Sequence, residues 1–247
     1  MKRFYQSAAA GELEGGYGVL LDGRPLRTPA AARLTVPSES LAAALAEEWA
    51  AQAERILPAS MPMTQIVCTA IDLAASEPER VVEELLGFAE AELLCYRAEE
   101  PEELVRRQAA LWQPLLDWAA EAYGARFLLA RGIVHQAQPP ESLAALGQAV
   151  ARYDPLTLAA LAAAVRAAGS LVVGLALTEG RLTPEEAFTV AELDETYNIE
   201  QWGEDAQAAA RRAAVRADLA AAHSVVTLLR RSRPAAQGST ESASSDV

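Results

Sequence analysis

SESLAAALAEEWAAQAERILPASMPMTQIVCTAIDLA, residues 38–74, sets the architecture of the chain, because the sequence before it is typical of short strands and the sequence after it of helices. Ser38 follows a proline and can cap a helix. Leu41, Leu45 and Trp49 recur every four residues in that helix, so they lie on one face. We therefore expect Trp49 to be a structural residue that holds the strand-rich part of the chain onto this helix.

The first helix is predicted to end at Leu57, because a residue before proline is pushed out of the α region. Pro62 follows closely, and a second helix is predicted to begin at Met63. Residues 57–63 then form a rigid elbow that sets the angle between two helices, and Pro62 is expected to be structural.

Asp22-Gly23 lies between two extended segments and predicts a two-residue hairpin turn, in which both central residues need positive φ. The predicted strands are Phe4–Ala10, Tyr17–Leu21, Arg24–Thr28 and Arg33–Val36. So few strands cannot bury a core alone, and the sheet must therefore rest on the first helices. The predicted fold class is α+β, with a small antiparallel β-containing N-terminal domain over residues 1–75 and a mainly α-helical domain over residues 76–231.

Helix-start signals punctuate the second part of the chain, and Ser76 and Thr183 each have Glu three residues later, the spacing of a capping box. The predicted helices are Glu77 to Tyr96, one from Pro101 that contains Pro114, Pro155 to Leu177, one from Thr183 to Glu195, and Gly203 to Arg231. Residues 127–135 are a candidate strand or hairpin. The Ser- and Ala-rich segment 232–247 predicts a disordered tail.

The segment Pro155–Leu177 is almost long and apolar enough to span a bilayer. Arg166 lies in its middle, Ala dominates over Leu and Ile, and Trp or Tyr does not flank both ends. We therefore interpret it as a buried central helix and expect no stable membrane insertion.

The charge of the chain is −13, from 21 basic and 34 acidic residues, and the excess is local. Residues 41–104 contain three basic and fourteen acidic residues, which accounts for −11. Such a surface disfavours nucleic acid and anionic membranes, and it attracts basic protein surfaces or cationic ligands. A solvated face that maintains solubility is the alternative interpretation.

The residues that usually carry catalysis or metal binding are sparse. Cys68 and Cys95 suit neither a zinc site nor a disulfide framework, so we expect buried, reduced thiols. His135 and His223 are the two histidines, and Lys2 is the single lysine, so phosphate-binding and Schiff-base motifs lack their usual residue. The N-terminus has no apolar run of the kind that forms a secretory signal.

One constellation could carry function, the segment AELDETYNIEQWGED at residues 191–205. Its carboxylates are Glu192, Asp194, Glu195, Glu200, Glu204 and Asp205, and its large aromatics are Tyr197 and Trp202. The carboxylates could hold a divalent metal or act as an acid/base pair, or they could form a solvated surface. Carboxylates beside exposed aromatics favour a third interpretation, a protein-binding patch.

Several segments together resemble the assembly chaperones for the catalytic head of F-type ATP synthase, of the type that acts on the alpha subunit. The resemblance extends to about residue 230 and rests on Arg3-Phe4-Tyr5, Leu21-Asp22-Gly23-Arg24, Glu48-Trp49 with Gln52, Met61-Pro62-Met63-Thr64, Thr69-Ala70-Ile71-Asp72, Leu94-Cys95-Tyr96-Arg97-Ala98, Trp112 with Pro114 and Trp118, Gly169-Ser170, Leu193-Asp194-Glu195 and Trp202-Gly203. Cys68 and Asn198 depart from the pattern, where the family has Asn and Gln.

The resemblance implies a chaperone with no catalytic residues, no cofactor and no metal, which binds the unassembled alpha subunit until the beta subunit displaces it. It implies a monomer in the bacterial cytoplasm, or in the mitochondrial matrix if the chain is a processed organellar form. The partner-binding candidates are Glu195, Asp194, Trp202, Glu204, Asp205 and Tyr197, with Glu195 the leading one, and the structural candidates are Trp49, Pro62, Asp72 and Arg97. The alternative function is a metal- or carboxylate-dependent small-molecule hydrolase built on the carboxylate cluster.

Overall fold

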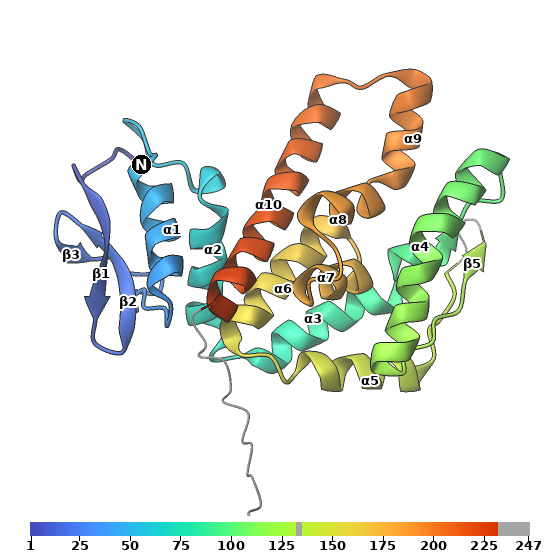
Figure 1. The fold of residues 1–247 in the computed structure, drawn as a ribbon, viewed down its shortest axis with the longest axis horizontal. Helices are drawn as coiled ribbons and strands as arrows, with labels where there is room; N and C mark the ends of the chain where they lie inside the picture. The colour runs from blue at the N-terminus through green and yellow to red at the C-terminus, as the bar shows by residue number, and fades with distance from the viewer. Residues whose placement is uncertain (132–134, 232–247) are drawn as a thin grey trace, which may run out of the picture.

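The computed structural model describes residues 1–131 and 135–231, which form a three-stranded sheet followed by helices (Figure 1). Strands β1 (Ala8–Leu13), β2 (Gly16–Leu21) and β3 (Arg24–Pro25) pair antiparallel in that order. Asp22 and Gly23 have φ of 48° and 78°, as the predicted hairpin turn requires. The α+β fold class is therefore confirmed.

Three of the predicted strand spans are wrong, and one of them, Arg24–Thr28, is too long because β3 ends at Pro25. The first strand begins at Ala8, because the residues before it pair with another segment: the Arg3 N–H donates to the Glu54 carbonyl at 2.9 Å. The predicted strand Arg33–Val36 forms only isolated bridges, to Arg27 and Tyr17. A turn that places Ala31 at φ 65° precedes it and limits the pairing.

Helix α1 (Glu39–Ala50) begins as predicted, since the Leu41 N–H donates to Ser38 Oγ at 3.2 Å. Leu41, Leu45 and Trp49 are buried on one face, against β1 and β2. The predicted end at Leu57 is wrong, because the segment after Ala50 turns to pair with the N-terminus, where the Ile56 N–H donates to the Met1 carbonyl.

The elbow that follows is held by a carboxylate from α1. After a 3₁₀ turn at Pro58–Ser60, helix α2 (Pro62–Thr69) begins with proline and passes into a π-helical turn, Ala70–Ala74. Glu48 accepts hydrogen bonds from the N–H groups of Met63 and Thr64, both at 2.8 Å, and from Thr64 Oγ1 at 2.7 Å. Three hydrogen bonds to one charged group at a helix N-terminus fix the angle between α1 and α2.

Helix α3 spans Pro78–Glu90. Its predicted capping box is wrong, because Ser76 Oγ donates backward to the carbonyls of Asp72 and Leu73. The helix also ends before Tyr96, since a 3₁₀ turn at Leu93–Cys95 leads into strand β4 (Tyr96–Arg97).

Strand β5 (Ala130–Arg131) pairs parallel with β4, so the segment 127–135 contributes a strand, and the pairing is not a hairpin. Residues 132–134 of that segment lie outside the described residues. The expected tail 232–247 lies outside them as well.

Helices α4 (Glu102–Tyr123), α5 (Pro140–Val150), α6 (Pro155–Ala168) and α7 (Leu171–Thr178) follow. The single predicted helix Pro155–Leu177 is wrong, because Gly169 adopts φ 68° and ends α6, and Ser170 Oγ caps α7 by accepting from the Val173 N–H at 3.0 Å. Every residue of α7 is buried. Among the described residues, no helix has the length and hydropathy needed to cross a membrane.

Helices α8 (Pro184–Ala191), α9 (Leu193–Trp202) and α10 (Ala206–Arg231) complete the fold. The Thr183–Glu186 capping box is confirmed, but α8 ends at Ala191 and not at Glu195, and α10 begins at Ala206 and not at Gly203. Figure 1 shows α9 and α10 running in opposite directions as a hairpin, with the end of α9 at its tip.

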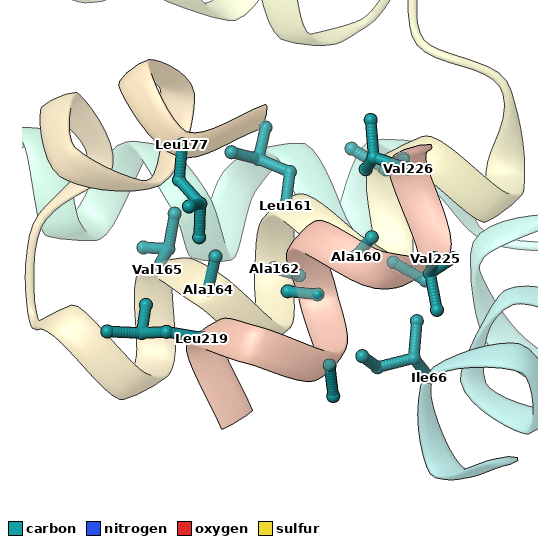
Figure 2. Close-up of a cluster of buried hydrophobic side chains, with 14 of the residues drawn as sticks. Ile66, Ala160, Leu161, Ala162, Ala164, Val165, Leu177, Leu219, Val225 and Val226 are labelled. Carbon is teal, nitrogen blue, oxygen red and sulfur yellow. The ribbon is translucent and has the colours of Figure 1, made fainter. Parts of the chain in front are cut away.

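The helical core forms where α10 lies against α6 and α7. Figure 2 shows aliphatic side chains from these helices and from α2 meeting there, among them Leu161, Leu177, Leu219 and Ile66. The helices approach closely, because a Cβ on Gly174 would come within 2.4 Å of a Val165 methyl group. The described cysteines are free, Cys95 buried and Cys68 only half-buried, and burial raises the pKa of the Cys68 thiol to about 11.

Candidate functional site

Helix α9 is held to α10 by a cluster of ion pairs. Glu192 precedes the first turn of α9 and is only 6% exposed. Its carboxylate accepts hydrogen bonds from Arg211 at 2.8 and 2.7 Å and from Arg212 at 3.3 Å. Arg212 also pairs with Glu204 at 3.2 Å, so two of the predicted cluster's carboxylates are used to join these helices.

A second face of α9 is held to α4. Gln108 Nε2 donates to Asp194 at 2.8 Å, and Arg107 donates to Glu200 at 2.7 Å. The Arg107 guanidinium also lies 5.4 Å from the centre of the Tyr197 ring, within range of a cation–π interaction. Asp194, Tyr197 and Glu200 therefore hold α9 in place.

A third face of α9 carries Glu195, Asn198 and Trp202, whose side chains make no hydrogen bond to another helix within the described residues. These residues are three and seven positions apart, which places them on one side of a helix. Trp202 is 87% exposed, and Asn198 is exposed. Within residues 1–131 and 135–231, Glu195 accepts no hydrogen bond, although it interacts electrostatically with Arg211. We call these three residues the α9 face.

The predicted cluster is therefore divided by the structure. Asp205 caps α10 by accepting from the Ala208 N–H at 2.8 Å, so it joins the residues that fix the hairpin. Sequence reasoning did not assign Asn198 to the site, nor did it identify Arg107, Gln108 and Arg211 as the partners. The helical spacing of residues 195, 198 and 202 could have indicated that Asn198 belongs to the site. The three partners could not be identified in this way, because pairing between helices has no local sequence signal.

The carboxylates do not converge on a common point. Within the described ranges, no group of three or more His, Cys, Asp or Glu side chains is arranged to hold a metal ion. The imidazole of His135 contacts a different part of the chain, because its Nδ1 lies 3.3 Å from the Tyr96 hydroxyl.

The predicted structural residues lie at junctions between elements. Trp49 is buried against Tyr5, whose hydroxyl donates to the Trp49 carbonyl at 2.7 Å. Asp72 accepts from Thr28 Oγ1 at 2.6 Å, which ties the π-helical turn to the segment after β3. Arg97 donates to the Leu94 carbonyl at 2.9 Å. Pro62 is the first residue of α2.

Comparisons with known proteins give a consistent result. A family model described as ATP12 chaperone protein matches residues 2–120. Protein atp12, mitochondrial, of Schizosaccharomyces pombe is 26% identical over 214 residues, which covers 82% of this chain and 74% of that protein.

Solved structures are more similar. The Atu1473 protein of Agrobacterium tumefaciens superposes with a TM-score of 0.85 at 48% identity, over 92% of this chain and 86% of that one. Atp12 from Paracoccus denitrificans superposes with a TM-score of 0.83 at 40% identity, over 93% of this chain and 98% of that one.

Proposed function

Because this chain belongs to the ATP12 chaperone family and is therefore a non-enzymatic assembly factor for the F1 part of ATP synthase, we propose that its client is the unassembled alpha subunit. The chaperone covers the alpha-subunit surface that the beta subunit buries after assembly. Such a surface is partly apolar and prone to aggregation while it is unpaired. The beta subunit then displaces the chaperone by competing for that surface.

We propose that the α9 face makes the contact with the client, and the observation that carries this is the exposure of Trp202. A tryptophan that is 87% exposed at the end of a helix gains a large apolar contact when a partner covers it. Glu195 lies on the same face two turns away, where it can pair with a basic group of the client. Asp194, Tyr197, Glu204 and Asp205 contribute indirectly, because their internal contacts hold α9 in position.

Family membership argues against the small-molecule hydrolase, because the family acts as an assembly factor. We propose that the chain acts as a monomer, in the bacterial cytoplasm or the mitochondrial matrix, where its client is synthesised or imported. A mitochondrial relative and bacterial relatives of similar structure support these two compartments.

The test measures light scattering while isolated alpha subunit refolds, without nucleotide or added metal. Wild-type chain should suppress the scattering. Trp202→Ala and Glu195→Gln should each require about thirtyfold more chaperone for equal suppression, since truncating one anchor of an interface costs roughly 2 kcal/mol. Their melting temperatures should stay within about 1 °C of wild type, because Trp202 is exposed and Gln preserves the shape of the half-buried Glu195.

Phe4→Ala and Glu121→Gln are the matched controls, one an exposed aromatic on the N-terminal part and the other an exposed carboxylate on α4. Both should protect as well as wild type. A strict requirement for ATP hydrolysis would refute the proposed mechanism. Full protection by both α9 variants would remove the α9 face from the client contact.

A further inference from the structure

A second surface lies on the other side of α10, where a groove of about 520 Å³ opens between α2, α6 and α10. Its lining is mostly small or aliphatic: Pro62, Ile66 and Thr69 from α2, Ala159, Ala163 and Ala167 from α6, and Ala214 and Val215 from α10. The three alanines of α6 recur every four residues, so they form a strip about 12 Å long. Figure 1 shows α10 diverging from α2 towards the N-terminal end of α10.

The charged groups of the groove are not equivalent. Arg166 makes two hydrogen bonds to Glu84, at 2.6 and 2.8 Å, and Arg211 makes two to Glu192. Both guanidinium groups are therefore already paired with carboxylates. Asp218 has no ion-pair or hydrogen-bond partner within residues 1–131 and 135–231. Asp218 is exposed, but the surrounding groove removes part of the water from its carboxylate and so raises its pKa above the ordinary value.

An unpaired carboxylate at the edge of an apolar groove selects for a cation on an otherwise apolar partner. Removing Asp218 further from water without a counter-charge would be unfavourable, whereas a Lys or Arg side chain would pair with it at the same time as the apolar contacts form. The groove does not favour an acidic partner, because both of its arginines are already paired with carboxylates of the chain. The strip of alanines allows the backbone of a further helix to approach α6 closely, as a ridge in the space between two flanking helices.

We propose that this groove binds an amphipathic helix of the client, with small or aliphatic residues against α6 and one Lys or Arg against Asp218. The inference rests on the proposed function for the identity of the client. Arg211 connects the two surfaces, because it lines the groove and also interacts with Glu195 of the α9 face. The groove and the α9 face together then form one contact region on both sides of α10.

The test uses two substitutions in the groove, each with a matched control outside it. Ala214→Leu fills the groove, and Ala213→Leu adds the same side chain one residue away on the same helix; both alanines are exposed, and Ala213 does not line the groove. Asp218→Lys reverses the charge of the groove, and Glu121→Lys makes the same charge change on α4. The dissociation constant for isolated alpha subunit is measured with each variant.

Both groove variants should weaken binding about tenfold or more, and both controls should bind within about twofold of wild type. Melting temperatures must match wild type for all four, because the substituted residues are exposed. A photo-crosslinker at position 214, but not one at 213, should capture a client peptide of helical periodicity that contains Lys or Arg.

If both groove variants bind alpha subunit as tightly as the wild-type chain, the groove proposal is refuted and the proposed function is not. Crosslinking to an acidic or extended client segment, or to a second copy of the chain, would refute the proposed occupant. Failure of the wild-type chain to bind alpha subunit at all would instead refute the proposed function, and this occupant with it.

Discussion

Glu192 offers the most direct test of how α9 is held, because its buried carboxylate joins two arginines of α10. The substitution Glu192→Gln preserves shape and removes the negative charge. It leaves the Arg212 side chain, which is 14% exposed, with Glu204 as its remaining ion-pair partner. It also leaves Arg211 without its bidentate partner, but that side chain is 51% exposed and can be solvated.

The expected cost follows from this difference in burial. Removing one partner of a buried ion pair destabilises a protein by about 3–5 kcal/mol. Since water can compensate Arg211, we expect about 3 kcal/mol, the lower end of that range. In a chain of this length, 1 kcal/mol corresponds to roughly 2–4 °C, so the melting temperature should fall by about 6–12 °C.

The assay is thermal unfolding followed by circular dichroism, with Arg211→Gln and Arg212→Gln measured alongside. The Arg211 variant should cost less than the Arg212 variant, because the Arg211 side chain is 51% exposed and Glu192 keeps Arg212 as a partner. The double substitution of Glu192 and Arg212 should cost less than the sum of the single ones, because they share one interaction. A fall of less than about 2 °C for Glu192→Gln, or equal effects of the two arginines, would contradict the reasoning.

Three further perturbations test other parts of the structure. Trp49→Arg should destabilise the chain by about 3 kcal/mol or more in urea denaturation, by burying an unpaired charge beside Tyr5, and an unchanged midpoint would show that residue 49 is exposed. Burial raises the pKa of Glu92 from 4.5 to about 7, so the folded state binds more protons between these values, and the unfolding free energy should fall as pH rises from about 4.5 to 7. Glu92→Gln should lose that part of the pH dependence, and a pH profile identical to that of wild type would show that Glu92 does not cause it. Gly174→Val should lower the melting temperature by several degrees, because its Cβ would clash with Val165, and normal stability would show that α6 and α7 can separate.

The sequence predicts the elements whose signals are local. Ser38, the Asp22-Gly23 turn and the Thr183–Glu186 capping box each act within three or four residues, and the structure confirms all three. One kind of error arises where a distant segment competes. Helix α1 ends early because residues 54–56 pair with the N-terminus, a contact between residues about 50 positions apart.

The break at Gly169 illustrates a different limit. The apolar run from Pro155 to Leu177 has no charge or proline at the break, so periodicity alone favours one helix. A glycine can end a helix by adopting positive φ, but many glycines inside helices do not. Here Glu92, from another part of the chain, accepts hydrogen bonds from the N–H groups of Leu171 and Val172, at 3.1 and 3.3 Å, and so stabilises a new helix N-terminus.

The candidate site shows the same difference between local signals and contacts with other helices. The sequence identifies the acidic and aromatic segment 191–205 but treats its carboxylates as one cluster. Their separate roles depend on partners in other helices. Arg107 and Gln108 lie on α4, far from this segment in the sequence, and Arg211 lies on α10. The groove beside α10 has no sequence signal, since alanines at intervals of four are also typical of a buried helix face.

The proposed contact region on both sides of α10 bears on how a chaperone without nucleotide hydrolysis can release its client. Two modest contacts joined in one molecule bind more tightly than either alone, because the second forms at a high effective concentration. The same arrangement allows stepwise displacement: a beta subunit that takes the client from one surface removes that advantage, and the remaining contact then dissociates quickly. A variant lacking the Trp202 contact and a variant with a filled groove should therefore each release alpha subunit faster than wild type in the absence of beta subunit. If displacement is stepwise, adding beta subunit should accelerate release from wild type by a larger factor than from either variant, and equal acceleration of all three in stopped-flow measurements would contradict it.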